Sequence, residues 1–234
     1  MKQQTRILVV EDEEAIRIGL IDVFVYHGYQ MDSAENGPDG LKKALTGRYN
    51  LILLDVMLPG MNGFDICNEI RQKDRKQPII MLTAKNSDEE IIQGLKLGAD
   101  DYVSKPFSIA QLVLRVEAVL RRSQVGIDQQ TKIRLNNDFV IDTENMTSQF
   151  AGNELTFTRR EIDILQYLAS NSKRPVPRDE LLTKVWGYAR DLDIETRTVD
   201  IHIAKLRRKI EPDPKQPVNL ITIRGAGYRL LVAD

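Results

Sequence analysis

Five polar side chains that could do chemistry stand in the first half of the chain, each at the end of a short apolar run. They are Glu11, Asp12, Asp55, Thr83 and Lys105. Three carboxylates placed together raise one another's pKa, and a hard divalent cation relieves their repulsion. Carboxylate oxygens with water are ligands that suit Mg²⁺. With a hydroxyl and an ammonium beside them, such a set could receive a phosphoryl group on a carboxylate.

The elements that must position these residues alternate between strands and helices. Short apolar runs that indicate buried strands cover residues 7–10, 29–34, 51–55, 78–82 and 101–104. Amphipathic stretches of helical period cover residues 13–27, 38–46, 63–73, 88–97 and 108–122. This alternation predicts a parallel sheet with helices on both faces. Ligands of such sheets bind outside the carboxyl ends of the strands, where the five polar residues fall.

Composition and charge narrow the class of protein. The chain has 234 residues, which suggests two domains, and 42% of them are hydrophobic. No apolar run reaches the ~20 residues of a membrane span, and the N-terminus lacks the order of a secretion signal, so we expect a cytoplasmic protein without membrane contact. The single Cys67 indicates a small apolar residue rather than a disulfide. Residues 196–229 hold 8 Lys+Arg and 3 Asp+Glu, which indicates a local anion-binding face.

The first half resembles the receiver domain of two-component response regulators over roughly residues 5–122. The resemblance is carried by Glu11-Asp12, Asp55 before VMLPGMNG, Thr83-Ala84, Tyr102 and Lys105-Pro106-Phe107. It implies that Asp55 accepts a phosphoryl group from the phosphohistidine of a sensor histidine kinase. It also implies a cis bond between Lys105 and Pro106, which costs far less before proline than elsewhere.

The same resemblance implies roles for the residues around Asp55. Mg²⁺ would be held by Asp12, Asp55 and the backbone carbonyl of Met57, with Glu11 assisting directly or through water. Lys105 would pair with the phosphoryl oxygens. Thr83 would move to hydrogen-bond them, and Tyr102 would follow inward as part of a switch.

Phosphorylation, by the same resemblance, pairs two receivers through the fourth helix, fifth strand and fifth helix. Two ion pairs would cross the two-fold axis, Asp101 with Arg115 and Asp100 with Arg122. A further charged pair of the family falls on Ile91 and Gln111, which makes this edge more apolar here.

The second half has the pattern of a small sheet, three helices and a hairpin. Residues 123–131 lack a period and predict a linker, and the alternating stretches after them predict short antiparallel strands. Thr158, followed three residues on by Glu161, predicts a capping box at a helix start. A second helix is expected from about Arg178. The third has its buried face at Val199, Ile203, Leu206 and Ile210.

A short helix, a basic helix and a β-hairpin in this order form a winged helix-turn-helix. Residues 132–232 resemble the effector domain of OmpR/PhoB-type regulators, through LTFTRREIDIL, RDELLTKVWG, RTVDIHIAKLRRKI and TIRGAGYRL. The resemblance implies that Arg178 and Arg197 hold DNA phosphates. The side chains expected on the outer face of the basic helix, toward the major groove, are Thr198, His202, Lys205 and Arg208.

Arg224 on the wing is placed to enter a minor groove. Two stretches depart from the family pattern. Ala204 stands where a basic residue is common, and the loop at 187–197 is long and acidic. Such loops often touch RNA polymerase, so that contact stays open.

We therefore expect an α/β receiver domain at 1–122, a linker at 123–131 and an α+β winged-helix domain at 132–234. The receiver should be flavodoxin-like, with a five-stranded parallel sheet of order 2-1-3-4-5. The expected function is a phosphorylation-activated, DNA-binding transcriptional regulator, not an enzyme beyond slow self-dephosphorylation.

Two alternatives remain. A Mg²⁺-dependent phosphohydrolase acting through aspartyl phosphate is one, but haloacid-dehalogenase-type phosphatases need an aspartate two residues after the nucleophile, where this chain has Met57. A receiver joined to an RNA-binding or protein-binding domain is the other.

Overall fold

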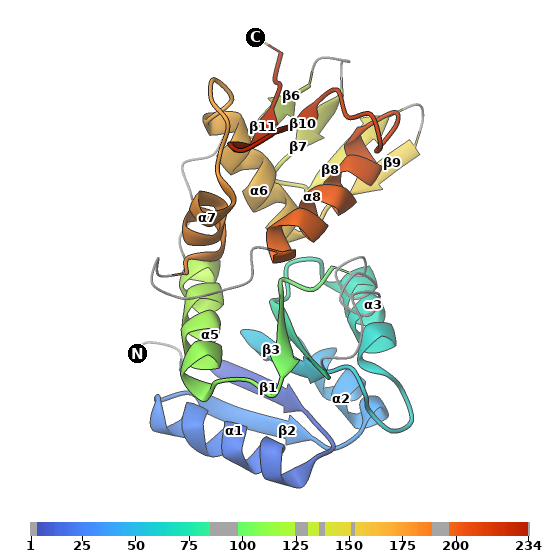
Figure 1. Cartoon of the computed structure of the whole chain (residues 1–234). Helices are drawn as coiled ribbons and strands as arrows, with labels where there is room; N and C mark the ends of the chain where they lie inside the picture. Colours follow the sequence, from blue (N-terminus) through green and yellow to red (C-terminus); the bar gives the residue numbers. More distant parts are fainter. Residues whose placement is uncertain are drawn as a thin grey trace. The chain divides into compact units, whose positions relative to one another are not determined.

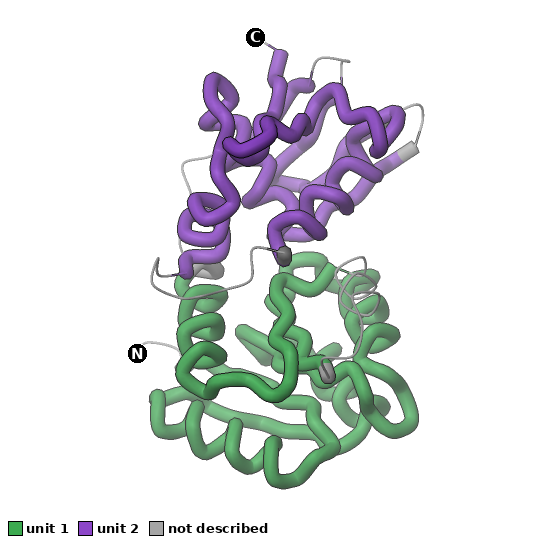
Figure 2. Tube along the Cα trace, in the orientation of Figure 1, with its two compact units in different colours: residues 1–121 green, residues 122–234 purple. Residues whose placement is uncertain are grey.

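The computed structural model describes residues 4–84, 98–124, 131–135, 139–150, 153–188 and 197–233. The chain divides into two compact units, Met1–Arg121 (unit 1) and Arg122–Asp234 (unit 2), shown in Figure 2. The helix expected at 88–97 lies outside the described residues, as does Ile91. None of the described helices has both the length and the apolar character that a membrane span needs.

Unit 1 is built on a five-stranded parallel sheet. Its strands are β1 (Arg6–Val10), β2 (Gln30–Ala34), β3 (Leu51–Asp55), β4 (Ile79–Ala84) and β5 (Asp101–Lys105). They are ordered β2-β1-β3-β4-β5, which confirms the order predicted from the sequence. Because all five run the same way, their carboxyl ends meet at one edge.

The described helices of unit 1 cover both faces of this sheet (Figure 1). They are α1 (Glu14–Tyr26), α2 (Gly37–Ala44), α3 (Gly63–Lys73) and α5 (Ile109–Gln124). On the face of α1 and α5, Val9 belongs to one buried cluster with Phe24 and Val116. The next residue of β1, Val10, points the other way and packs against Gly40 of α2, since side chains alternate along a strand.

The first residue of α3 is in backbone contact with the end of β3, the strand that carries Asp55. Asn62 caps this helix by accepting a hydrogen bond from the backbone of Asp65. Gly63 donates its N–H to the Val56 carbonyl at 2.9 Å, and a Cβ at Gly63 would overlap the Asp55 carbonyl oxygen. Only glycine allows this close approach, which places the end of β3 rigidly.

Unit 2 begins with a four-stranded antiparallel sheet in the order β6-β7-β8-β9. The strands are β6 (Lys132–Arg134), β7 (Val140–Asp142), β8 (Thr147–Phe150) and β9 (Asn153–Thr156). Three helices follow, α6 (Arg159–Ser170), α7 (Arg178–Leu181) and α8 (Arg197–Ile210), and α7 continues into a π-helical turn, η1 (Leu182–Trp186). A hairpin of β10 (Leu220–Ile223) and β11 (Gly227–Leu230) completes the winged-helix order.

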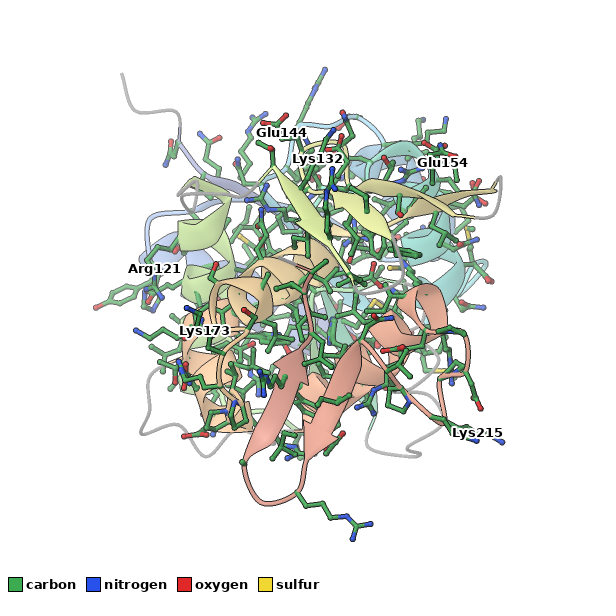
Figure 3. All side chains as sticks on the ribbon, turned by 90° about the horizontal axis from the view of Figure 1, so that it is seen from above. Arg121, Lys132, Glu144, Glu154, Lys173 and Lys215 are labelled. Atoms are coloured by element: carbon green, nitrogen blue, oxygen red, sulfur yellow. The ribbon has the colours of Figure 1, made fainter. Side chains whose placement is uncertain are left out.

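Two local predictions for unit 2 are confirmed. Thr158 and Glu161 form the capping box at the start of α6. The apolar stripe of α8 is buried, and its residues are Val199, Ile203, Leu206 and Ile210. The outer surface carries charge instead. The six side chains labelled in Figure 3 are all charged and exposed, and all but Arg121 belong to unit 2: Lys132, Glu144, Glu154, Lys173 and Lys215.

Candidate functional site

The carboxyl edge of the receiver sheet brings three of the predicted residues into contact. Glu11 directly follows β1, Asp55 ends β3 and Lys105 ends β5. The Lys105 ammonium lies 2.8 Å from Glu11 Oε1 and 2.9 Å from Asp55 Oδ2. These segments lie far apart in the sequence, and the parallel sheet joins them.

The acidic side chains at this edge fit a hard divalent cation. Glu11, Asp12 and Asp55 each offer a carboxylate oxygen, and these atoms lie within 4.8 Å of one another. Glu11 is fully buried, and its Oε2 has no hydrogen-bond partner among the described residues. A buried acceptor without a donor is costly, and a cation or a proton removes that cost. Met57 donates its backbone N–H to Asp55 Oδ1 at 3.3 Å.

The electrostatics of the edge follow from burial and close charges. Burial raises the pKa of Glu11 to about 7, with the nearby Asp55 adding to the effect and Lys105 opposing it. Burial alone would lower the pKa of Lys105, but its hydrogen bonds to Glu11 and Asp55 raise it. The ammonium is therefore charged at neutral pH, and Glu11 is poised between its two forms.

Two residues of this site carried no assignment from the sequence. Glu13 Oε1 lies 3.5 Å from the Lys105 ammonium. Arg17 donates to the carbonyl oxygens of Glu11 at 2.8 Å and Asp12 at 3.0 Å, which fixes the loop that follows β1. Glu13 belongs to the acidic run 11–14 and could have been predicted as a residue of this site. For Arg17, the sequence shows only that it lies in the first turns of a helix, which does not indicate a role in the site.

The two residues assigned to a switch are both inside unit 1. Thr83 lies on β4 and is 2% exposed, and Tyr102 lies on β5 and is 6% exposed. The Tyr102 hydroxyl has no hydrogen-bond partner among the described residues, and burial raises its pKa well above the usual value. The Lys105–Pro106 bond is cis, as expected.

The two aspartates expected in ion pairs across a dimer axis also form ion pairs within this chain. Asp101 is fully buried and pairs with Arg115 of the same chain at 2.7 Å. Asp100 pairs with Arg71 of the same chain at 3.0 Å. Arg71 on α3 is buried and needs an anion, which Asp100 beside it supplies.

The remaining residues of the expected interface add little. The side chain of Arg122 lies outside the described residues, as does Ile91. Gln111 is half-buried, and its backbone N–H faces the Ser108 hydroxyl at 3.5 Å.

Unit 2 corrects the expected outer face of α8. Thr198, His202 and Lys205 were expected on that face, but they are 9%, 1% and 9% exposed. His202 packs its ring against Trp186 with ring centres 5.2 Å apart, and its Nδ1 lies 2.9 Å from the Thr198 carbonyl oxygen. Burial lowers the pKa of His202 to about 4, so the ring is neutral at pH 7.

Lys205 faces inward because a buried carboxylate lies beneath α8. Its ammonium lies 2.9 Å from Glu161 Oε1, and Lys209 lies 2.6 Å from Glu161 Oε2. The exposed residues of α8 include Ala204 and Arg208, and Arg224 is exposed on the hairpin turn. Arg197 begins α8, but its side chain lies outside the described part of the chain.

Arg178 lies at the start of α7 within a polar cluster that sequence reasoning missed. Its guanidinium donates to Asp200 at 2.6 Å and to the Tyr228 hydroxyl at 2.9 Å. Burial, followed by the bond to Asp200, raises the pKa of Tyr228 to about 12, so the hydroxyl keeps its proton.

Comparison with known proteins places both units. Residues 7–117 match the family model described as the response regulator receiver domain, and residues 152–230 match the model described as transcriptional regulatory protein, C terminal. The sensory transduction protein RegX3 of Mycobacterium tuberculosis is 39% identical over 227 residues, covering 97% of this chain and 99% of the relative. PhoP of Bacillus subtilis, an alkaline phosphatase synthesis transcriptional regulatory protein, is 41% identical over 232 residues, covering 96% of each.

Among solved structures, the response regulator DrrB of Thermotoga maritima, an OmpR/PhoB homologue, matches with a TM-score of 0.52 and 30% identity, covering 98% of this chain and 100% of that one. The class defined by receiver and winged helix is that of response regulators. Within it, the chain belongs to the OmpR/PhoB family and is a phosphorylation-activated, DNA-binding transcriptional regulator. A sensor kinase and DNA are the partners that these two domains imply.

Proposed function

We propose that Asp55 is the phosphoacceptor of this regulator. One Asp55 oxygen attacks the phosphorus of a phosphohistidine, the phosphorus–nitrogen bond breaks, and the histidine nitrogen leaves with the bonding electrons. The contact that supports this most directly is the Lys105 ammonium, 2.9 Å from Asp55 Oδ2, since a fixed cation beside the acceptor stabilises the phosphoryl oxygens. Thr83 and Tyr102 are assigned to the response that follows.

Mg²⁺ is the cofactor of this proposal. Glu11, Asp12, Asp55 and the Met57 carbonyl would hold it, and it would neutralise charge on the transferred group. The residues of the chain do the rest: Lys105 orients the acceptor, and Arg17 holds the loop that carries Glu11 and Asp12.

The phosphorylated chain acts as a homodimer and binds duplex DNA through unit 2, with α8 in the major groove. Arg178 and Arg197 are assigned to phosphates, Arg208 to the groove and Arg224 to the wing. Thr198, His202 and Lys205 are buried, and they can contact DNA only after their present interactions break, such as the His202–Trp186 ring contact and the Lys205–Glu161 ion pair. Slow self-dephosphorylation, a cytoplasmic location and a contact with RNA polymerase complete the proposal.

Incubation with acetyl phosphate and Mg²⁺ tests the acceptor. A regulator takes up about one phosphate per chain and releases it slowly, whereas a phosphohydrolase turns the donor over continuously. Asp55→Asn should take up none while keeping the fold, because the amide is nearly isosteric; Asp65→Asn, an exposed aspartate on α3, is the matched control. Phosphate recovered on the intact Asp55→Asn protein would refute the assignment.

A further inference from the structure

Three elements of unit 2 meet at one closed set of hydrogen bonds. Arg178 of α7 donates through Nε to Asp200 Oδ1 of α8 at 2.6 Å and through Nη2 to the Tyr228 hydroxyl of β11 at 2.9 Å. That hydroxyl donates in turn to Asp200 Oδ1 at 2.6 Å. The guanidinium carbon also lies 4.8 Å from the centre of the Tyr228 ring. Each member of this clamp, Arg178, Asp200 and Tyr228, contacts the other two.

The backbone holds both ends of the clamp in place. Val176 and Tyr228 exchange hydrogen bonds of 2.7 and 2.9 Å, which joins the segment before α7 to the wing strand. At Gly227 a Cβ would overlap the Val176 carbonyl oxygen, so the two backbones touch. Arg207 of α8 lies on the Tyr228 ring as well, at 5.8 Å, and donates to the Leu220 carbonyl oxygen.

The clamp leaves part of the guanidinium available. The Arg178 side chain is 36% exposed. Its Nη1 makes no hydrogen bond within the described residues, which leaves two donors on one nitrogen and a third on Nη2. An oriented, half-exposed guanidinium with donors to spare suits a phosphate oxygen, and the side chain loses little freedom when it binds.

We propose that Asp200 and Tyr228 are positioning residues that hold Arg178 ready for one phosphate of the DNA backbone. Through them, α8 and the wing strand β11 are held in a fixed position relative to the residue that contacts the phosphate. The inference rests on the DNA contact proposed for Arg178. Removal of the Tyr228 hydroxyl tests the positioning role more clearly than removal of the Asp200 carboxylate. Asp200 both orients Arg178 and repels phosphate, so its removal has opposing effects.

The experiment uses the full-length, phosphorylated chain and two duplexes, a site selected from random sequence and an unrelated one. The variants are Tyr228→Phe, Arg178→Ala and the double variant, each titrated at several salt concentrations. Arg178→Ala should weaken binding to both duplexes alike and flatten the salt slope by about 1. Tyr228→Phe should weaken both about fivefold, the equivalent of one hydrogen bond, and leave the slope unchanged.

The double variant distinguishes positioning from a merely structural role. In the Arg178→Ala background, Tyr228→Phe should have no further effect, since the group that it positions is gone. Tyr167→Phe is the matched control, because the Tyr167 hydroxyl also donates to a carboxylate that pairs with an arginine: it bonds Glu180 at 2.6 Å, and Arg174 bonds the same oxygen at 2.6 Å. It should leave DNA affinity unchanged, and thermal unfolding checks that every variant is folded.

A full fivefold loss on adding Tyr228→Phe to Arg178→Ala overturns the inference, and so does a single Tyr228→Phe variant that binds like the wild type. Either result leaves the proposed Arg178 contact standing. If Arg178→Ala changes neither affinity nor slope, the contact itself is refuted and the positioning role falls with it.

Discussion

His202 ties the stability of unit 2 to pH. In the unfolded chain this ring titrates near pH 6.5, and burial lowers its pKa to about 4 in the fold. Between these values the unfolded state binds more protons, so the free energy of unfolding rises with pH. The stability is fully present above pH 6.5 and is lost as pH falls toward 4, by at most about 3 kcal/mol.

Urea unfolding at pH 5 and pH 7 measures this effect. His202→Gln should remove the loss of stability at pH 5 that protonation of His202 causes, whatever it does to stability at both pH values. His27→Gln, at the other histidine of the chain, should keep it. A pH dependence that His202→Gln leaves unchanged would contradict the assignment of a buried neutral ring.

Met57 bears on the lifetime of the phosphoryl group. It stands two residues beyond Asp55 and is 64% exposed at the mouth of the acidic edge. A thioether cannot orient an attacking water, whereas an amide can. We expect a long-lived aspartyl phosphate and a severalfold shorter lifetime in Met57→Asn, followed by the decay of labelled protein. Met61→Asn, in the same loop, is the control; an unchanged or longer lifetime in Met57→Asn counts against the argument.

At the scale of elements, the packing of α8 on α6 depends on one buried carboxylate. Glu161 is fully buried, and although burial alone would raise its pKa, Lys205 and Lys209 lower it to about 2. Glu161→Gln leaves two ammonium groups without their anion, so it should cost about 3–5 kcal/mol in urea unfolding. Adding Lys205→Met should recover part of that loss.

Glu180→Gln is the matched control for this prediction. Glu180 pairs with a half-exposed Arg174 at 2.6 Å, and such a pair contributes about 1 kcal/mol or less. If the two substitutions lower the free energy of unfolding equally, the buried carboxylate of Glu161 contributes no more than an exposed ion pair, and the prediction is wrong.

The same elements show how far the sequence alone predicts the fold and the site. The positions of the β-strands of unit 1 along the chain follow from short apolar runs, and the start of α6 follows from Thr158 and Glu161, because these signals are local. The order of the strands within the sheet was implied by the resemblance to receiver domains. The acidic edge was predictable because a parallel sheet collects strand ends. The inward orientation of Lys205 and Lys209 could not be predicted. Their partner, Glu161, lies as many as 48 residues away in the sequence, and no periodic pattern of residues indicates such a contact.

At the scale of the whole molecule, the proposed activation by dimerisation must be reconciled with an ion pair found inside one chain. Asp101 and Arg115 lie 2.7 Å apart in the same chain. An isologous dimer would place each of them near its partner's copy as well. Charge reversal can separate the two arrangements.

Asp101→Arg gives a chain with two arginines at this pair, and Arg115→Asp gives a chain with two aspartates. Each should dimerise poorly when phosphorylated, because like charges across an interface cost several kcal/mol. The double variant, Asp101→Arg with Arg115→Asp, restores the pair within a chain and across the axis, so it should dimerise again whichever arrangement holds. It therefore controls for damage to the fold.

The mixture of the two single variants decides between the arrangements. In a heterodimer of these chains, both contacts across the axis join opposite charges, while neither chain regains its internal pair. Sedimentation of the phosphorylated mixture should therefore show a dimer if the cross-axis pairs hold the active state, after a check that both variants still accept phosphate. A mixture as monomeric as its components, beside a double variant that dimerises, would assign the pair to the single chain and remove it from the interface.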